Sequence, residues 1–92
     1  MKGLCWIRAT RDYAPGDPAY YAVGDEEPIV HKGDVGQVVT RLSKKKEMYC
    51  VEFSEIDEDI MREKYSVLID MHVSEMDFIH PEDKDDEWPE DW

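Results

Sequence analysis

Positive charge is scarce in this chain of 92 residues. Its 11 Lys and Arg residues stand against 23 Asp and Glu residues, which gives a formal net charge of −12 at pH 7. Nucleic acids and anionic membrane surfaces are themselves negatively charged and would repel such a chain. The composition therefore argues against nucleic acid and membrane as partners, and it favours a basic protein surface, a cation or simple solubility.

Long apolar runs are also missing. No segment approaches the roughly 20 apolar residues of a membrane-spanning helix, and the first residues lack the apolar core of a signal peptide. We therefore expect a cytoplasmic protein. A chain of this length forms one domain, in which we assign residues 1–80 to the folded part and residues 81–92 to a tail.

Cysteine and histidine are few, with two and three residues. Cys5 and Cys50 lie in predicted strands, where we expect buried reduced thiols, with a disulfide between neighbouring strands as the alternative. Neither belongs to a Cys-x-x-Cys pair, and His31, His72 and His80 have no metal-ligand spacing. A nucleophile elbow is also absent. We expect no enzyme activity, no catalytic residue, no cofactor and no metal; the alternative is a metal site that the fold assembles from these cysteines and histidines.

The most informative stretch, residues 28–40, reads Pro-Ile-Val-His-Lys-Gly-Asp-Val-Gly-Gln-Val-Val-Thr. Its Lys-Gly-Asp centre predicts a turn, because Gly33 adopts a positive φ without strain and Asp34 can bond to its own backbone two residues further on. The β-branched residues that follow predict a strand, and Gly36 inside it indicates a bulge or a close approach of another segment. A turn that leads into a bent strand is typical of small barrels.

Alternation of apolar and polar residues predicts five short strands. In the first of them, Cys5, Ile7 and Ala9 should face the core, while Trp6 should cap the barrel or be exposed. The predicted strands are residues 4–11, 36–42, 48–53, 65–71 and 77–80.

The segments between the strands are predicted as connections. Residues 13–27 are rich in Pro, Gly and Asp and predict a long loop rather than a helix. Residues 54–63 are acidic and predict a short helix or a loop, because Ile56 and Ile60 lie one helical turn apart. Residues 81–92 predict a disordered tail. Short turns are predicted at residues 43–47 and 73–76.

These elements together predict an all-β fold. The chain has no internal repeat and no sustained helical periodicity. The number of strands, the long loop near the start and the turn before the last strand match a small, five-stranded antiparallel barrel of the SH3-like type. We expect this barrel to carry a long N-terminal loop and a disordered acidic C-terminal tail.

Three groups of residues are candidates for contact with a protein partner. The long loop has more aromatic side chains than a solvated loop needs, and the alternative is that these side chains pack the loop onto the barrel. The hairpin at residues 43–47 concentrates positive charge, and the alternative is a solvated tip. The tail sets two tryptophans among seven carboxylates, and the alternative is a solubilising segment. The predicted partner-binding residues are Tyr13, Tyr20 and Tyr21 in the loop, Arg41, Lys44, Lys45 and Lys46 at the hairpin, and Trp88 and Trp92 in the tail.

Four of the predicted strand segments carry a resemblance to known proteins. They are Gly33-Asp34-Val35-Gly36-Gln37-Val38, Tyr49-Cys50-Val51-Glu52-Phe53, Val67-Leu68-Ile69-Asp70 and the segment from Glu75 to Pro81. These segments resemble a family of accessory barrels that includes the carboxy-terminal domain of the nitrile hydratase β-subunit, its small activator proteins and the nitrogen-fixation NifZ proteins. Members clasp, mature or adjust a metalloenzyme or redox enzyme without carrying the chemistry. The resemblance implies a non-catalytic accessory or regulatory protein that docks on such an enzyme, to assist its maturation or modulate its activity.

A second resemblance, to the peptide-binding SH3 domain, gives the alternative function. Ala9-Thr10-Arg11-Asp12-Tyr13 is similar to that family's Ala-Leu-Tyr-Asp-Tyr strand, and Lys32-Gly33-Asp34-Val35 is similar to its Lys-Gly-Asp turn. This resemblance implies a module that binds proline-rich or basic peptide segments, whose basic residues meet an acidic loop. The contacts would then come from Tyr13, Tyr20, Asp25, Glu26 and Glu27.

Overall fold

The computed structural model describes residues 5–57, 59 and 61–80. In this part of the chain, strands and one short 3-10 helix follow one another without any α-helix. The all-β prediction is therefore confirmed. The elements are β1 (Cys5–Ala9), β2 (Tyr20–Val23), β3 (Val35–Ser43), β4 (Met48–Asp57), β5 (Arg62–His72), the 3-10 helix η1 (Val73–Glu75) and β6 (Met76–Phe78).

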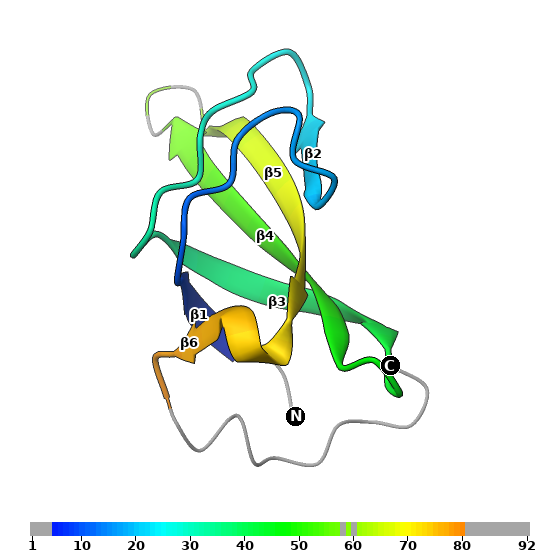
Figure 1. The fold of residues 1–92 in the computed structure, drawn as a ribbon. Helices are drawn as coiled ribbons and strands as arrows, with labels where there is room; N and C mark the ends of the chain where they lie inside the picture. The colour runs from blue at the N-terminus through cyan, green and yellow to red at the C-terminus, as the bar shows by residue number, and fades with distance from the viewer. Residues whose placement is uncertain (1–4, 58, 60, 81–92) are drawn as a thin grey trace.

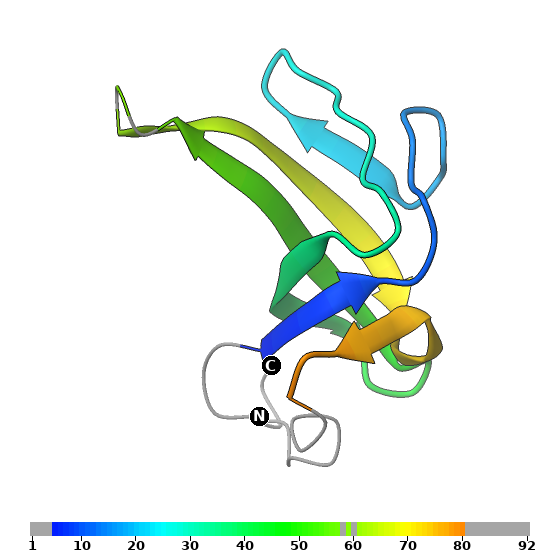
Figure 2. The same ribbon diagram turned by 90° about the vertical axis from the view of Figure 1, so that its left-hand side faces the viewer.

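The strands form one antiparallel sheet in the order β2-β5-β4-β3-β1-β6 (Figure 1). The sheet is strongly bent, and in Figure 2 β1 and β6 lie across the lower part of the β4–β5 ribbon instead of extending it. The register shifts between β3 and β4, and again between β4 and β5. Such shifts favour bending, because an extra residue in one strand kinks it and increases its twist.

The loop predicted for residues 13–27 contains a strand, so the prediction of five strands and one long loop is wrong. Within this segment β2 pairs with β5, and Tyr20 lies opposite Ile69. The sequence does not predict β2, because this strand has only four residues and Pro18 and Gly24 lie close to its two ends. Such a short edge strand is stabilised by the strand with which it pairs, rather than by a long alternating pattern of its own.

Most of the described residues between 54 and 63 lie in strands, and not in the helix or loop that their composition predicts. Strand β4 continues through Asp57 and β5 begins at Arg62, so the two strands extend a hairpin in which Glu55 lies opposite Tyr65. A helix here would be charged nearly all round and would have little apolar surface to bury. The hairpin instead pairs the backbone polar groups of both strands.

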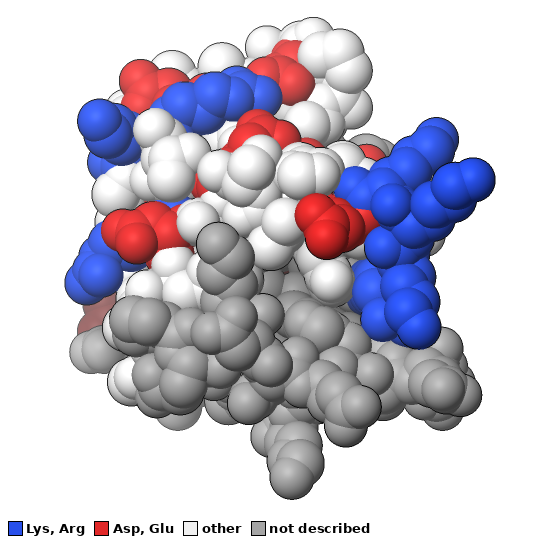
Figure 3. Space-filling view, turned by 60° about the horizontal axis from the view of Figure 1, so that its bottom comes forward, with Lys and Arg blue, Asp and Glu red and all other residues white. Residues whose placement is uncertain are grey.

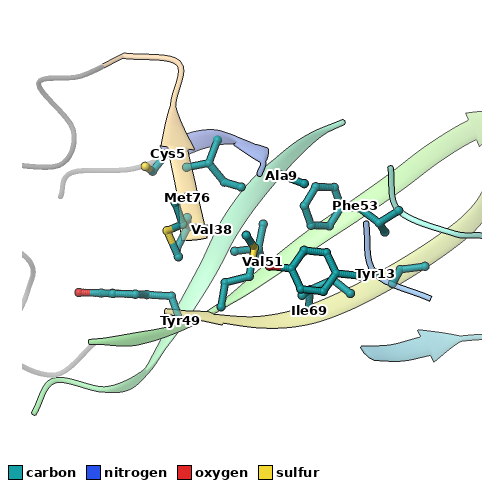
Figure 4. Packing of buried hydrophobic residues seen from close by; sticks show 13 residues of the cluster. Cys5, Ala9, Tyr13, Val38, Tyr49, Val51, Phe53, Ile69 and Met76 are labelled. Atoms are coloured by element: carbon teal, nitrogen blue, oxygen red, sulfur yellow. The ribbon is translucent and has the colours of Figure 1, made fainter. Parts of the chain in front are cut away.

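The hydrophobic core lies inside the bend of the sheet (Figure 4). In β1, Cys5, Ile7 and Ala9 are buried and Trp6 is exposed, so the predicted alternation is confirmed. The core receives side chains from β1, β3, β4, β5, β6 and the long loop. Its members are Cys5, Ile7, Ala9, Tyr13, Val30, Val38, Tyr49, Val51, Phe53, Val67, Ile69, Met71 and Met76.

Gly36 marks a close approach between β3 and β4, as the sequence predicts. A Cβ atom at this position would lie 2.7 Å from Cε1 of Phe53 and 2.8 Å from Cγ1 of Val51. The ring of Phe53 therefore packs directly on the backbone of β3. The nearest irregularity in the strand register is separate and lies between Val38 and Thr40.

Both cysteines are buried and neither forms a disulfide, which confirms the expectation of buried reduced thiols. Burial raises the pKa of the Cys50 thiol, and the negative charges of Asp70 and Glu52 raise it further. Because the thiolate is the reactive form, this raised pKa disfavours reaction at Cys50.

The turn predicted around Gly33 is confirmed, and hydrogen bonds tie it to the end of β1. Gly33 has a φ of 94°, and its N–H donates to the carbonyl of Ala9 at 2.8 Å. The N–H of Ala9 donates to the carbonyl of Asp34 at 2.9 Å. The Asp34 carboxylate accepts from the N–H of His31, three residues before it, where the sequence predicted a bond two residues further on. These bonds fix the place at which the long loop returns to the sheet.

Candidate partner-binding surfaces

The segment between β1 and β3, which contains β2 and which we call the long loop, is held in shape by hydrogen bonds. Tyr13 and Val30 form an isolated bridge, in which each N–H donates to the other residue's carbonyl at 2.8 and 2.9 Å. The N–H of Tyr20 donates to the carbonyl of Asp17 at 2.9 Å. The hydroxyl of Tyr20 donates to the carbonyl of Pro28 at 2.6 Å and joins the two branches of the loop. The loop therefore presents its remaining side chains from a fixed frame.

A surface hollow of about 270 Å³ lies against β2, and we call it the β2 hollow. Two of the predicted partner-binding residues, Tyr20 and Tyr21, meet here. Tyr21 is 66% exposed, whereas Tyr20 is half-buried. Burial raises the pKa of the Tyr20 hydroxyl, and the charge of Glu27 raises it further. The hollow is lined by Pro15, Gly16, Tyr20, Tyr21, Ala22 and Glu27.

Tyr21 also begins a row of side chains across the outer face of the sheet. Strand pairing sets Tyr21 opposite Leu68, Leu68 opposite Glu52, Glu52 opposite Gln37 and Gln37 opposite Trp6. Adjacent strands lie about 4.8 Å apart, so side chains in neighbouring positions of the row can contact one another. The two ends of the row are exposed aromatic residues. The β2 hollow therefore adjoins a larger mixed surface.

Tyr13 is the exception among the loop tyrosines, because its side chain is fully buried. Its hydroxyl donates to Oε2 of Glu75 at 2.8 Å, and the guanidinium of Arg11 lies 3.8 Å above its ring. Burial and the bond to Glu75 raise the pKa of the Tyr13 hydroxyl far above its ordinary value. Tyr13 therefore attaches the loop to η1 and the core, and the prediction that it contacts a partner is corrected to a structural role.

Asp17 holds the turn that forms one wall of the β2 hollow. Its Oδ1 accepts a hydrogen bond from the N–H of Ala19 at 2.9 Å, and its Oδ2 lies 3.0 Å from the guanidinium of Arg11. The bond from Ala19 and then the pairing with Arg11 lower the pKa of the Asp17 carboxyl. Both interactions favour the ionised carboxylate.

The lowered pKa of Asp17 predicts a pH dependence of stability. A carboxyl that is more acidic in the folded state stabilises the protein fully above the unfolded-state pKa, and this contribution is lost as the pH falls through the folded-state value. The stability difference between wild type and Asp17→Asn should therefore shrink as the pH is lowered, because asparagine keeps the acceptor for Ala19 but has no charge. Urea unfolding of both proteins across acid pH measures this difference. A difference that stays constant with pH would contradict it.

The basic hairpin lies at the lower end of Figure 1, whereas β2 and its loop lie at the upper end. Lys44, Lys45 and Lys46 are exposed in the turn that joins β3 to β4, and Arg41 on β3 is half-buried. Figure 3 shows one large group of Lys and Arg side chains at the right of the view and smaller groups at the left. Together these four residues form a patch separate from the β2 hollow.

The structure thus divides the predicted partner-binding residues. Tyr20 and Tyr21 meet in the β2 hollow, and the four basic residues meet at the hairpin, while Trp88 and Trp92 lie outside the described residues. Glu27, predicted for a peptide-binding module, also lines the hollow. The sequence analysis missed Pro15, Gly16 and Ala22 as lining residues. The Pro-Gly-Asp-Pro sequence at residues 15–18 was the available signal, because it predicts a tight turn next to the tyrosines.

Among residues 5–57, 59 and 61–80, no helix has the length and apolar character needed to cross a membrane. In these ranges, no group of three or more His, Cys, Asp or Glu side chains is placed to hold a metal ion. Comparison of the chain with protein-family models, with curated proteins and with solved structures finds no match. The family resemblances inferred from the sequence therefore remain predictions.

Proposed function

We propose that this chain is a non-catalytic protein-binding domain, built as an SH3-like barrel, which docks on a larger protein through the β2 hollow. In this proposal the chain supplies a binding surface and modulates or assists its partner. A metalloenzyme or redox enzyme is the partner class that the accessory-barrel resemblance implies. The net charge of −12 favours a partner with a basic surface.

The arrangement of the elements supports the SH3-like part of the proposal. A long, folded-back loop follows the first strand, and β3, β4 and β5 form successive hairpins. The short helix η1 precedes the last strand, which returns to pair with β1. This order of elements is what supports a small, strongly bent barrel as the finer description of the fold. Folds of this kind serve many functions, so the binding role has to be argued from the surface.

The observation that carries the proposal is the position of Tyr21, whose side chain is 66% exposed on a hydrogen-bonded strand beside a hollow. Tyrosine is enriched in protein interfaces, because it offers a large apolar ring with a polar end and loses little side-chain entropy on binding. A fixed backbone further reduces the entropy lost on association. The row from Tyr21 to Trp6 offers additional contact area next to the hollow.

Replacing Tyr21 by alanine should abolish most of the binding to the partner. Truncation of a central interface tyrosine commonly costs at least about 2 kcal/mol, which corresponds to roughly 30-fold in the dissociation constant. Partners are captured on the full-length wild-type protein from an extract of its source cells, and the proteins retained specifically are quantified. With Tyr21→Ala, the retained amount of such a protein should fall by at least about tenfold.

The matched control is Met61→Ala. Met61 is 80% exposed and lies in the turn between β4 and β5, away from the β2 hollow. This variant loses a similarly exposed apolar side chain and should retain the partner at the wild-type level. Circular dichroism should show the same fold for both variants. Equal retention by Tyr21→Ala and Met61→Ala would refute the proposed role of the hollow.

A second candidate function is the recognition of a proline-rich peptide, and it uses the same hollow. Aromatic grooves bind polyproline helices, and an adjacent carboxylate selects a flanking basic residue. Tyr20, Tyr21 and Glu27 provide these groups together, whereas Tyr13 is buried. Titration with a proline-rich peptide that ends in arginine separates the two candidates. Saturable binding that Glu27→Gln weakens favours the peptide module, and its absence favours docking on a folded partner.

A further inference from the structure

A second cleft lies between the returning end of the long loop and the β4–β5 hairpin. Its volume is about 210 Å³, smaller than the roughly 300–1,000 Å³ of pockets that enclose drug-sized ligands. A single amino-acid side chain is the natural occupant of such a space. The cleft is lined by Ile29, Val30, Asp34, Val35, Phe53, Ser54, Glu55 and Tyr65.

The cleft exists because β4 and β5 extend beyond the core. Phe53 is still buried and belongs to the lining of the cleft. Two pairs of residues further along the hairpin, Glu55 and Tyr65 lie opposite each other. Ile29 of the long loop and Val35 at the start of β3 also line the cleft, and they are 49% and 46% exposed. The lining therefore offers apolar and aromatic side chains.

The lining of the cleft also carries negative charge. Asp34 and Glu55 both belong to it. Burial raises the pKa of the Tyr65 hydroxyl, and the charges of Glu55, Asp34 and Glu26 raise it further. Three carboxylates thus lie near enough to act on one hydroxyl. A lining that combines apolar and acidic side chains suits a side chain with an apolar stem and a cationic end.

We propose that this cleft binds an arginine side chain of a partner protein. The aliphatic stem of the arginine would lie against Ile29 and Val35, and its guanidinium would meet the carboxylates of Asp34 and Glu55. Arginine fits better than lysine, because its planar group can bond to two carboxylates and stack on the ring of Tyr65. This cleft is separate from the β2 hollow, so an experiment can refute one of the two proposed binding sites without refuting the other.

A second copy of this chain is a less suitable occupant. Its hairpin could offer Arg41 and three lysines, but each copy carries a net charge of −12. Repulsion between two such molecules opposes their association. A basic partner protein is instead attracted both by the whole chain and by the acidic residues of the cleft.

The test uses the full-length, ¹⁵N-labelled protein and two short peptides. One is acetyl-Gly-Ala-Arg-Ala-Gly-amide, and the other has citrulline, the neutral isostere of arginine, in place of arginine. The arginine peptide should shift the amide resonances of Val35, Ser54, Glu55 and Tyr65 in a saturable manner, and the citrulline peptide should not. Glu55→Gln should raise the dissociation constant about tenfold, because one charge-assisted contact is lost.

Two control variants make the result specific. Asp77→Asn removes one exposed carboxylate from β6, outside the cleft, and Tyr21→Ala alters the β2 hollow. Both should bind the arginine peptide like the wild type. Equal shifts with both peptides, or equal weakening by Glu55→Gln and Asp77→Asn, would overturn the proposal. It would also be overturned if sedimentation showed a dimer that Glu55→Gln dissociates, because the occupant would then be a second copy.

Discussion

Replacing Tyr13 by alanine should lower the free energy of unfolding by about 3–5 kcal/mol, the usual loss for a buried aromatic residue. The side chain has no exposed surface, its hydroxyl donates to Glu75 and its ring lies under Arg11. Alanine would leave a cavity between the loop and the core and would remove the hydrogen bond that the Tyr13 hydroxyl donates to the Glu75 carboxylate. A domain of this size has only about 5–15 kcal/mol of stability, so a large fraction would be lost. Urea unfolding followed by tryptophan fluorescence measures the change.

Tyr13→Phe is the matched control, because it keeps the ring and removes only the hydroxyl. We expect it to cost about 1–3 kcal/mol, the range for a hydrogen bond to a charged group, and to retain partner binding. A Tyr13→Ala protein of wild-type stability that no longer binds its partner would contradict this account. Tyr13 would then be a contact residue, as the sequence alone suggested.

Replacing Gly36 by alanine should destabilise the protein by about 1–3 kcal/mol, the typical effect of overpacking a core. The added Cβ would lie 2.7 Å from Cε1 of Phe53 and 2.8 Å from Cγ1 of Val51, much closer than van der Waals contact allows. On strand propensity alone, alanine would be slightly better than glycine. The sign of the measured change therefore distinguishes steric conflict from backbone preference.

A double-mutant cycle with Phe53→Leu identifies the conflict. Leucine in place of Phe53 removes the ring atoms closest to the new Cβ, so Gly36→Ala should be less harmful in the Phe53→Leu background. The coupling energy for residues in contact is commonly about 0.5–3 kcal/mol. The free energy of unfolding of the four proteins is measured by urea unfolding. Additive effects of the two substitutions, within about 0.5 kcal/mol, would show that the ring of Phe53 does not limit the space at Gly36.

Much of the fold could be predicted because the main strands have clear local signals. The alternation of Cys5, Ile7 and Ala9 is enough to identify β1 and its buried face, and Gly36 indicates the close approach of another segment. The missed elements have weak local signals. Strand β2 depends on pairing with β5, and the acidic extension of the β4–β5 hairpin depends on backbone pairing rather than on apolar residues.

The candidate sites were predictable only in part. Aromatic enrichment singled out Tyr13, Tyr20 and Tyr21 together, but it does not show which ring turns inward. In the fold, the ring of Tyr13 turns inward, and its hydroxyl donates a hydrogen bond to Glu75, which is distant in sequence. The proposed arginine cleft was not predicted, because Tyr65, Ile29 of the long loop and Val35 of β3 meet only through the tertiary fold.

In the function proposed above, the folded domain itself binds the partner through the β2 hollow. The decisive experiment measures the affinity of the purified captured partner for three proteins: the full-length chain, a chain ending at Pro81, and Tyr21→Ala in the full-length chain. We expect the shortened chain to bind within about threefold of the full-length chain, and Tyr21→Ala to bind at least about tenfold more weakly. If the shortened chain loses binding and Tyr21→Ala retains it, the segment with Trp88 and Trp92 carries the interaction and the proposed role of the β2 hollow is wrong.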